Sequence, residues 1–547
     1  MSGTEKSSIE IRHWSEIISE QARQEFGNDQ VIASGWSPSG IYHIGNFREA
    51  ATCTGIQRQL AYDGAKTKFV MIVDDFDPLD KIPSVLKKYK KELKPYLGHP
   101  VCRVPDFTGD SETYAEHFAK GLIEAMELFE MNVEIVYASR LYKEGNYDDY
   151  LKLYYGHEEE VQNLLENISG NRLSTFVSVV CENCGSIGNT KVTKYDPETE
   201  EIHYECVDNN YRKGCGHKGK INLSSHEWKL KWRLDWPARQ DFLNVTVEPA
   251  GKDHSVAGGS VDTSIAIHEK IFNRKPPIMV RYGFITLKGG KKLSGSAGTG
   301  DPAASAGKFM PPSSFLFMVF KNDLLTDIQF SPSSMDVPKT VDEYDVARKY
   351  LLGIEIPPQE RAGKKLATSV KIAIPEDKRK TPPPRIKYMD LALVAQIYQR
   401  NEEQIFERLK ERKVILPDDP LEMIQEIKDR LQHIYYWLDK YAPESAKFVI
   451  PDEIPSEALN KINKENLKLF IEMLKQAKEK KINDANKLGE FFKQTFENNN
   501  LSPKEVFPSF YYALLGKKGG PKASFLTLVL GYDYVINKLE MIYQKIS

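Results

Sequence analysis

The stretch from residue 30 to residue 77 constrains the fold of this chain more than any other. It begins with QVIASGW, which has the pattern of a short buried strand, and continues through a glycine-rich turn into FREAATCTGIQRQLAYDG, a helix expected to end near Gly64. KTKFVMIVDDFD then returns as a second strand. A strand, a helix and a parallel strand form a right-handed crossover, whose ligand site lies at the carboxyl end of the first strand. The pattern therefore predicts a Rossmann-like α/β domain with a site close to His43.

The turn at residues 34–49, SGWSPSGIYHIGNFRE, surrounds His43 with small residues. Backbone N–H groups at a helix start favour a phosphate, and glycines such as Gly40 and Gly45 let a nucleotide approach the main chain closely. The turn therefore predicts a nucleotide pocket. A single glycine-rich turn is weak evidence, and the alternative is that His43 only caps the turn.

Length and composition limit the class of protein. The chain has 547 residues, more than one hydrophobic core usually organises, which predicts roughly two to four domains. No apolar run approaches the roughly 18 residues that a bilayer span needs, so we expect a globular chain with no membrane partner. The first residues show neither an export nor an organelle signal, so we expect a cytoplasmic protein. A net charge of −2 neither indicates nor excludes a nucleic-acid partner, because binding depends on where the 75 basic residues lie.

Four of the six cysteines fall within one short segment. CENCG places two thiols on a tight turn, and YECVDNNYRKGCGHKG supplies a second pair, which suits a tetrahedral zinc ion. We predict a structural zinc site that staples an insertion at about residues 175–222, with the ligands Cys181, Cys184, Cys206 and Cys215. Two alternatives stay open: His217 replaces Cys215 as the fourth ligand, or the four cysteines are buried and reduced without a metal.

A second glycine-rich loop lies far downstream, within RYGFITLKGGKKLSGSAGTGD at residues 281–301. An apolar strand leads into it. Lys292 can place a mobile ammonium on a phosphate chain, while the hydroxyls of Ser294 and Ser296 and the backbone amides supply neutral donors. Taken alone, this pattern also fits an exposed flexible loop.

Together the two loops are more specific. HIGN at residues 43–46 and KLSGS at residues 292–296, in this order in a Rossmann-like chain, resemble the HIGH and KMSKS signatures of class I aminoacyl-tRNA synthetases. Several further stretches look like class I lysyl-tRNA synthetase and cover most of the chain: VDDFD, DSETYAEHF, YASRLY, LKWRLDWPARQ, EPAGKDHSVAGGSVDT and GKKGGPKASFL. The resemblance implies ATP-dependent attachment of L-lysine to lysine tRNA through a lysyl-adenylate, with Mg²⁺ on the pyrophosphate. The alternative is a tRNA-binding paralogue that has lost amino-acid activation.

The resemblance also implies roles for individual residues. His43, Asn46 and Lys292 would be catalytic, because they stabilise the charge that develops when the lysine carboxylate attacks the α-phosphate. The ATP site would comprise Pro38, Gly40, His43, Gly45, Asn46, Asp253, Gly258, Gly259, Lys292, Ser294 and Ser296. The lysine site would comprise Gly35, Ser37, Trp232, His254 and Tyr282, joined by Asp74 and Asp75, whose carboxylates can hold an ammonium group. For Trp232 and Tyr282, ordinary core packing is the alternative.

Two stretches depart from the family pattern. Ala297 stands where family members often carry a second lysine in the signature loop, so one phosphate contact is expected to be missing. In VPDFTGDSETYAEHF, Asp110 and Ser111 occupy positions where some members carry Cys and His ligands. Asp106 and His117 remain, but two such ligands do not close a tetrahedral zinc site, so we expect no second zinc.

Beyond the signature loop the composition changes. Proline-rich breaks at EIPPQE and KRKTPPPRIK interrupt the chain. Four later segments have apolar residues at three- and four-residue spacing, which predicts helices: LALVAQIYQRNEEQIFERLKER, DPLEMIQEIKDRLQHIYYWLDKYA, KENLKLFIEMLKQAKEKK and DANKLGEFFKQTFENN. We predict a Rossmann-like catalytic domain at 1–300 with its zinc-stapled insertion, a connecting stem-contact segment at 301–345 and an all-helical domain at 346–547. The resemblance implies that the helical domain binds the anticodon, and we expect a monomer.

Overall fold

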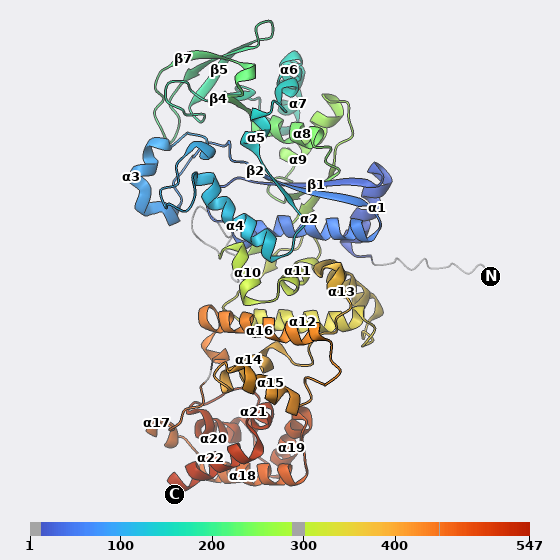
Figure 1. The fold of residues 1–547 in the computed structure, drawn as a ribbon, viewed down its shortest axis with the longest axis vertical. Coiled ribbons are helices and arrows are strands. Elements are labelled where there is room, and N and C mark those ends of the chain that lie inside the picture. Colours follow the sequence, from blue (N-terminus) through green and yellow to red (C-terminus); the bar gives the residue numbers. More distant parts are fainter. Residues whose placement is uncertain (1–11, 287–300, 448, 547) are drawn as a thin grey trace, which may run out of the picture. The chain divides into compact units, whose positions relative to one another are not determined.

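The computed structural model describes residues 12–286, 301–447 and 449–546 (Figure 1). The chain divides into two compact units, which are described separately. The first comprises Met1–Lys308, Pro312–Ser331 and Ala347–Lys380, and the second comprises Phe309–Pro311, Pro332–Val346 and Thr381–Ser547. Among the helices of the described ranges, none combines the length and the apolar character that crossing a bilayer requires.

A five-stranded parallel sheet forms the centre of the first unit, in the order β10, β9, β1, β2, β3. The strands are β1 (Asp29–Trp36), β2 (Lys66–Val73), β3 (Glu134–Tyr137), β9 (Val247–Gly251) and β10 (Ile278–Tyr282). In β1, Ile32 lies opposite Phe69 of β2 and Val247 of β9, and all three side chains are buried. Burial on both faces is typical of parallel sheets covered by helices. This arrangement confirms the predicted Rossmann-like sheet.

Helix α2 (Ile44–Tyr62) connects β1 to β2 and confirms the predicted crossover helix. Its core-facing residues, such as Ile56, are fully buried. Gly55 allows its neighbours to approach closely, since a Cβ at this position would lie 2.9 Å from the Trp14 ring and 3.0 Å from the Phe320 ring. Further helices of this unit are α1 (Trp14–Phe26), α4 (Tyr114–Leu128), α8 (Trp232–Phe242), α9 (Ser260–Lys270), α11 (Pro312–Phe320), α13 (Glu360–Ala373) and α10 (Ala303–Phe309), whose last residue belongs to the second unit.

Between β3 and β9 the chain leaves the parallel sheet. Three helices, α5 (Ala138–Lys143), α6 (Asp148–Gly156) and α7 (Glu158–Ser169), lead to an antiparallel pair, β4 (Val177–Val179) and β8 (Trp228–Leu230). Between these two strands, a three-stranded antiparallel sheet forms from β5 (Thr190–Asp196), β6 (Glu201–Cys206) and β7 (Lys218–Asn222). The small sheet thus lies in the stretch where an insertion is predicted, and the β4–β8 pair closes its base.

The second unit is helical throughout its described residues. Its main helices are α14 (Tyr388–Ile397), α15 (Glu402–Glu411), α16 (Leu421–Lys440), α18 (Lys464–Glu479), α19 (Ala485–Asn498), α20 (Pro503–Leu515), α21 (Ala523–Leu530) and α22 (Tyr532–Lys545). All four predicted helical segments are confirmed. The first of them forms two helices rather than one, because Gln399 and Arg400 adopt positive φ values of 46° and 65°, which a continuing helix does not tolerate.

The two units divide inside helix α12 (Asp336–Leu351), between Val346 and Ala347. Within the second unit, the buried guanidinium of Arg430 donates to both oxygens of Asp345, at 2.7 and 2.5 Å, and so ties α16 to the first part of α12. The domain limits expected from the sequence stay predictions.

Candidate active site

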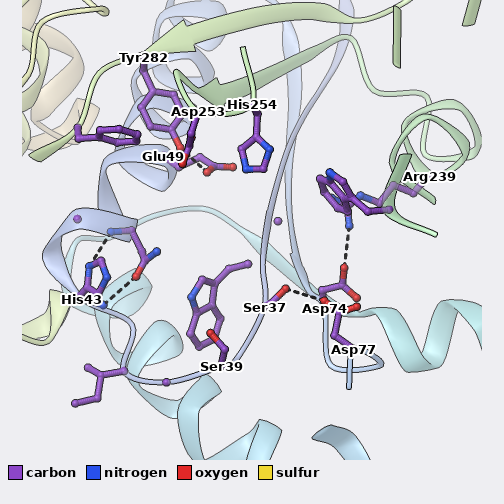
Figure 2. Close-up of a pocket in the computed structure, with 18 of the residues that line it drawn as sticks. Ser37, Ser39, His43, Glu49, Asp74, Asp77, Arg239, Asp253, His254 and Tyr282 are labelled. Carbon is purple, nitrogen blue, oxygen red and sulfur yellow. Dashed lines mark hydrogen bonds and ion pairs between the residues drawn. The ribbon is translucent and has the colours of Figure 1, made fainter. Parts of the chain in front are cut away.

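A cavity of about 550 Å³ opens where four strands of the parallel sheet end (Figure 2). β1 ends at Trp36, β2 leads into Asp74, β9 leads toward Asp253 and β10 ends at Tyr282, and all four residues line the cavity. The carboxyl ends of parallel strands are the usual ligand site of open α/β sheets. The fold therefore places this cavity where a substrate is expected.

His43 stands at the N-terminus of α2 and caps it. Its Nδ1 accepts a hydrogen bond from the backbone N–H of Asn46 at 3.2 Å, and Asn46 Oδ1 accepts one from the backbone N–H of His43 at 3.4 Å. This capping box satisfies donors that a helix start leaves unpaired. His43 and Asn46 also line the cavity, so His43 is a cap and a cavity residue together. The positive end of the helix at this point favours an anionic group.

The ammonium of Lys229 joins two carboxylates on one side of the cavity. Its Nζ lies 2.5 Å from Asp74 Oδ1 and 2.5 Å from Asp77 Oδ1. Ser37 Oγ donates to the other oxygen of Asp77 at 3.0 Å (Figure 2). Burial alone would lower the pKa of Lys229, but the two carboxylates more than offset this effect and raise the pKa above its ordinary value. Both aspartates therefore have a permanent cation of the chain as partner.

Arg239 of α8 provides a second buried cation, directly behind Gly35. A Cβ at residue 35 would lie 2.8 Å from Nη2 of Arg239, so glycine leaves the room that the guanidinium needs. The guanidinium also lies over the Trp232 ring, 4.9 Å from its centroid, and 3.8 Å from Asp74 Oδ2. The guanidinium of Arg239 thus lies next to both Gly35 and Trp232.

Glu49 lies beside Tyr282, away from Asp74 and Asp77 (Figure 2). Its carboxylate accepts hydrogen bonds from Ser34 Oγ and from the Tyr282 hydroxyl, both at 2.6 Å. Burial raises the pKa of Glu49 to about 7, although the two hydroxyl donors act in the opposite direction. Within the described ranges, no basic side chain forms an ion pair with Glu49.

Outside the cavity, four cysteines come together beside the three-stranded sheet: Cys181, Cys184, Cys206 and Cys215. The Sγ atoms of Cys181 and Cys215 are 3.7 Å apart, and those of Cys184 and Cys206 are 3.8 Å apart. Four thiolates at about 2.3 Å from a tetrahedral zinc ion would be about 3.8 Å apart. The donor set and its spacing are therefore compatible with zinc. His217 is not a member of this group, and its Nε2 lies 3.8 Å from Glu182 Oε2.

A smaller group of possible metal ligands comprises Asp106, Asp110 and His117, whose donor atoms lie within 4.8 Å of one another. These side chains already bond to their neighbours: Thr108 Oγ1 donates to Asp106 at 2.8 Å, and His117 Nδ1 lies 3.4 Å from Asp106 Oδ2. The absence of a second zinc stays a prediction.

Known proteins identify the family. Residues 12–373 match the family model described as tRNA synthetases class I (K). The chain is also 33% identical to the lysine–tRNA ligase of Methanocaldococcus jannaschii, over 97% of this chain and 99% of that protein. The chain belongs to the class I lysyl-tRNA synthetases. The lysine–tRNA ligase of Archaeoglobus fulgidus is 30% identical over 96% of this synthetase and 99% of its own length. A solved glutamate tRNA ligase from Elizabethkingia meningosepticum is 14% identical, covers 95% of this chain and all of its own, and has a TM-score of 0.41.

The cavity of the synthetase brings together most of the residues that the sequence predicted. It is lined by Gly35, Ser37, Gly40, His43, Gly45, Asn46, Asp74, Trp232, Asp253, His254 and Tyr282. It does not include Pro38, Asp75, Gly258 or Gly259. Asp75 instead accepts hydrogen bonds from the backbone N–H and the Oγ of Ser139, at 2.8 and 2.6 Å, and burial raises its pKa to about 6. Lys292, Ser294, Ser296 and Ala297 lie outside the described residues.

Four charged residues of the synthetase cavity were not predicted: Glu49, Asp77, Lys229 and Arg239. A signal for three of them was present in the sequence. Lys229 interrupts the apolar strand WKL, and Glu49 and Arg239 lie within helices that bury most of their neighbours. A charged residue in a buried stretch is expected to have a charged partner or a ligand.

Proposed function

We propose that this class I lysyl-tRNA synthetase attaches L-lysine to lysine tRNA in two steps, of which the first consumes ATP. The lysine carboxylate attacks the α-phosphate of ATP, giving lysyl-adenylate and pyrophosphate, and a hydroxyl of the terminal ribose of the tRNA then displaces AMP. The observation that carries the proposal is a single cavity that joins the His43 turn to a negatively charged amino-acid site. Similarity to lysine–tRNA ligases over nearly the whole chain supports the same reaction. Neither observation favours a paralogue without amino-acid activation.

The charge of the cavity favours a cationic amino acid. Its lining holds four carboxylates against two permanent cations, a net charge of −2 when all of them are ionised: Glu49, Asp74, Asp77 and Asp253 against Lys229 and Arg239. Lysine brings an additional ammonium that offsets this charge, whereas glutamate would add a further carboxylate. Selection of lysine over glutamate therefore uses repulsion of the wrong substrate as well as attraction of the correct one.

Glu49 is the carboxylate that we assign to an ammonium group of the bound lysine. Asp74 and Asp77 already share Lys229, whereas the partners of Glu49 are hydroxyl groups. An ammonium beside Glu49 would favour its ionised form and lower its raised pKa. Tyr282 holds the carboxylate in place for this contact, and the exposed ring of Trp232 offers an apolar surface for the alkyl stem.

The His43 turn supplies the nucleotide side of the proposed site. Gly40, Gly45 and Asn46 line the cavity with it. Both flanks of segment 287–300 reach this side, since Ile285 lines the cavity and the carbonyl of Asp301 accepts a hydrogen bond from the N–H of Ile44 at 3.1 Å. The position of these two flanks supports the assignment of Lys292, Ser294 and Ser296 to the phosphates. Mg²⁺ would accompany the pyrophosphate there. We assign Asp253, Gly258 and Gly259 to the ribose and the adenine.

The activation step needs no general base, because the attacking carboxylate is already ionised. Rate enhancement then depends on the position of the two substrates and on donors aimed at the charge that develops on the α-phosphate. We assign this role to His43, Asn46 and Lys292. The loss of one such donor typically costs roughly 100- to 1000-fold in rate.

The cysteine cluster is proposed to hold a structural zinc ion that staples the insertion at 175–222. Four thiolates leave no open position on the metal for chemistry. Cys181→Ser is expected to lose the metal, whereas the matched variant His217→Ala is expected to keep it, as metal analysis of the purified proteins would show. Retention of zinc by Cys181→Ser would contradict this assignment.

The helical second unit is proposed to bind the anticodon of lysine tRNA. The basic segment GKKGGPK at residues 516–522 belongs to this unit, and phosphate contacts suit such a segment. We also propose that the synthetase acts as a monomer in the cytoplasm, where translation occurs.

Pyrophosphate exchange tests the proposed function directly. Exchange of labelled pyrophosphate into ATP is measured with lysine, glutamate, glutamine or arginine, each with and without lysine tRNA. Exchange that depends on lysine alone is the expected result. Silence with every amino acid, in a protein that still binds tRNA, would instead support the paralogue without activation.

A further inference from the structure

Residues 80–94, DKIPSVLKKYKKELK, form the most basic short stretch beside the cavity, and we call it the lysine-rich segment. It holds six lysines and two acidic residues, a net charge of +4, whereas the whole chain carries −2. The mechanism proposed above uses none of these lysines, which are Lys81, Lys87, Lys88, Lys90, Lys91 and Lys94.

The segment has one apolar face and one basic face. It folds into two short 3₁₀ turns, η1 (Ser84–Tyr89) and η2 (Lys94–Tyr96), on either side of one turn of α-helix, α3 (Lys90–Leu93) (Figure 1). Leu86 and Leu93 are buried, with 6% and 1% of their surface exposed. Apolar residues three and four apart direct the chain onto the core and turn the other positions outward. All six lysines are accordingly exposed.

These lysines have no acidic partner among the described residues. Elsewhere in this unit, exposed lysines commonly pair with carboxylates, as Lys152 pairs with Glu200 at 2.6 Å and Lys308 with Glu124 at 2.7 Å. In the part of the chain that the structure describes, none of the six forms an ion pair. Lys88 lies over the Tyr89 ring, 4.7 Å from its centroid. A cluster of uncompensated like charges repels itself, so it gains most from a polyanionic partner.

The segment is anchored at the cavity through its main chain. It starts three residues after Asp77, which lines the cavity. Its base is closed by hydrogen bonds from the N–H of Leu79 to the carbonyl of His99 at 2.8 Å and from the N–H of Gly98 to the carbonyl of Leu79 at 2.9 Å. Its buried residues also belong to one apolar cluster with Trp36 and Ile41, which line the cavity. The segment is therefore joined directly to residues that line the cavity.

We infer that the lysine-rich segment binds the sugar–phosphate backbone of the acceptor arm of tRNA while the 3′ end of the tRNA enters the cavity. This inference rests on the proposed function, which requires that end of the tRNA at the cavity. Phosphate contacts by lysine are independent of base sequence, so the segment contributes affinity and orientation rather than choice of tRNA. A protein partner fits less well, because protein interfaces need apolar or aromatic anchors, and Val85, 39% exposed, is the large apolar side chain that this face offers.

Two variants with equal loss of charge test the inference. In the first, Lys87, Lys88, Lys90 and Lys91 are changed to serine. In the control, four exposed lysines from other surfaces of the same unit are changed to serine: Lys66, Lys143, Lys191 and Lys270. Binding of an in vitro transcribed lysine tRNA is measured by fluorescence anisotropy at several salt concentrations, and aminoacylation is measured at increasing tRNA.

We expect the first variant to bind tRNA at least about tenfold more weakly near 0.1 M salt, and the control less than about threefold more weakly. The dependence of log Kd on log salt should become shallower by up to roughly 3.6 in the first variant, because each of four lost phosphate contacts contributes about 0.9. Its KM for tRNA rises, while kcat at saturating tRNA stays within about twofold of the original enzyme. Replacement of the same four lysines by arginine should restore binding, since it restores the charge.

Equal weakening in both serine variants, or unchanged binding in the first, would overturn the inference. A fall in kcat at saturating tRNA with unchanged affinity would also overturn it. Thermal unfolding of both serine variants checks that the fold is retained. If the first serine variant unfolds, the arginine variant takes its place in the test. Weakened tRNA binding by the arginine variant, in which the charge is restored, then overturns the inference, and full binding supports it. If the original enzyme binds tRNA but activates no lysine, the proposed function fails, and the binding comparison still decides this inference.

Discussion

Asp74 and Asp77 on one side of the cavity and Glu49 on the other are all carboxylates, but they have different partners. The two aspartates share the buried ammonium of Lys229 at 2.5 Å, whereas Glu49 accepts hydrogen bonds from two neutral hydroxyl groups. Among the described residues, the chain supplies a counter-ion to the two aspartates and none to Glu49. This difference separates carboxylates that have a partner cation in the chain from the one that we assign to a cationic ligand.

Removal of the Lys229 ammonium is expected to have the largest effect. Lys229→Met removes the cation that lies 2.5 Å from the buried Asp74 and leaves it the more distant guanidinium of Arg239 at 3.8 Å, and breaking a buried ion pair costs about 3–5 kcal/mol. We expect the free energy of unfolding in urea to fall by roughly 3 kcal/mol, because Asp77 is 40% exposed and water can solvate it.

Lys231→Met is the matched control for this change. Lys231 lies two residues further on, and its ammonium donates to the hydroxyl of Ser178 at 2.6 Å. Burial lowers its pKa, and we expect its loss to cost about 1 kcal/mol or less. Equal destabilisation by the two variants would break the comparison between the two sides of the cavity.

Glu49→Gln is expected to change affinity rather than stability. A hydrogen bond to a charged group contributes about 1.5–3 kcal/mol, so lysine should bind roughly 10- to 100-fold more weakly in calorimetry. The free energy of unfolding should stay the same or rise, since a desolvated carboxylate has been removed. Glu248→Gln provides the control: Glu248 is buried in β9, accepts a hydrogen bond from Gln240 at 2.6 Å and does not line the cavity. Its lysine affinity should remain close to that of the original enzyme.

The pKa of Glu49 predicts how lysine binding depends on pH. Only the ionised carboxylate attracts an ammonium, so affinity should rise with pH up to about 7, by at most about tenfold per unit, and level off above. Glu49→Gln should remove this dependence between pH 6 and pH 8, and a slope that persists in the variant would assign it to another group.

The contribution of Glu49 to the free energy of unfolding depends on pH in the opposite direction to the lysine affinity. Burial raises the folded-state pKa of Glu49 from 4.5 to about 7, so between these values the folded chain holds a proton that the unfolded chain has released. The contribution of Glu49 to stability is therefore fully present below pH 4.5 and is lost as pH rises toward 7.

The smallest effect is expected for Ser37→Ala. This change removes the 3.0 Å hydrogen bond to Asp77 but leaves the ion pair with Lys229. The free energy of unfolding should fall by about 1 kcal/mol in urea. A loss as large as that of Lys229→Met would show that the hydroxyl, and not the ammonium, holds Asp77.

Much of the fold could be predicted because its helices and strands are specified by local sequence patterns. The apolar run of β1 and the amphipathic spacing of α16 each lie within one short stretch of sequence, and both elements form where the sequence predicted them. The family resemblance named Gly35 and Tyr282 for the site, whereas the local pattern by itself predicted that the site lies at the carboxyl end of the first strand, close to His43.

Pairings between distant segments could not be predicted in this way. Lys229 and Asp77 are 152 residues apart, and no local pattern specifies that their side chains meet. The need for glycine at residue 35 likewise depends on Arg239, which reaches it from another helix. Asp75 shows the converse, since its position beside Asp74 suggested a shared role, but β2 ends at Val73 and Asp75 stands in the turn that follows, where Ser139 binds it instead.

The main-chain hydrogen bond between Leu79 and His99 makes two properties of the enzyme independent of each other. They are the surface charge of residues 80–94 and the arrangement of the residues around the cavity. Because backbone atoms make this closure, the outward-facing side chains of residues 80–94 can be exchanged without a change in how the segment joins the sheet. Its charge can be reversed, diluted or increased while the residues around the cavity keep their contacts. On the inference that these residues bind tRNA, an engineer could thus change the affinity for RNA and its dependence on salt independently of the chemistry of amino-acid activation.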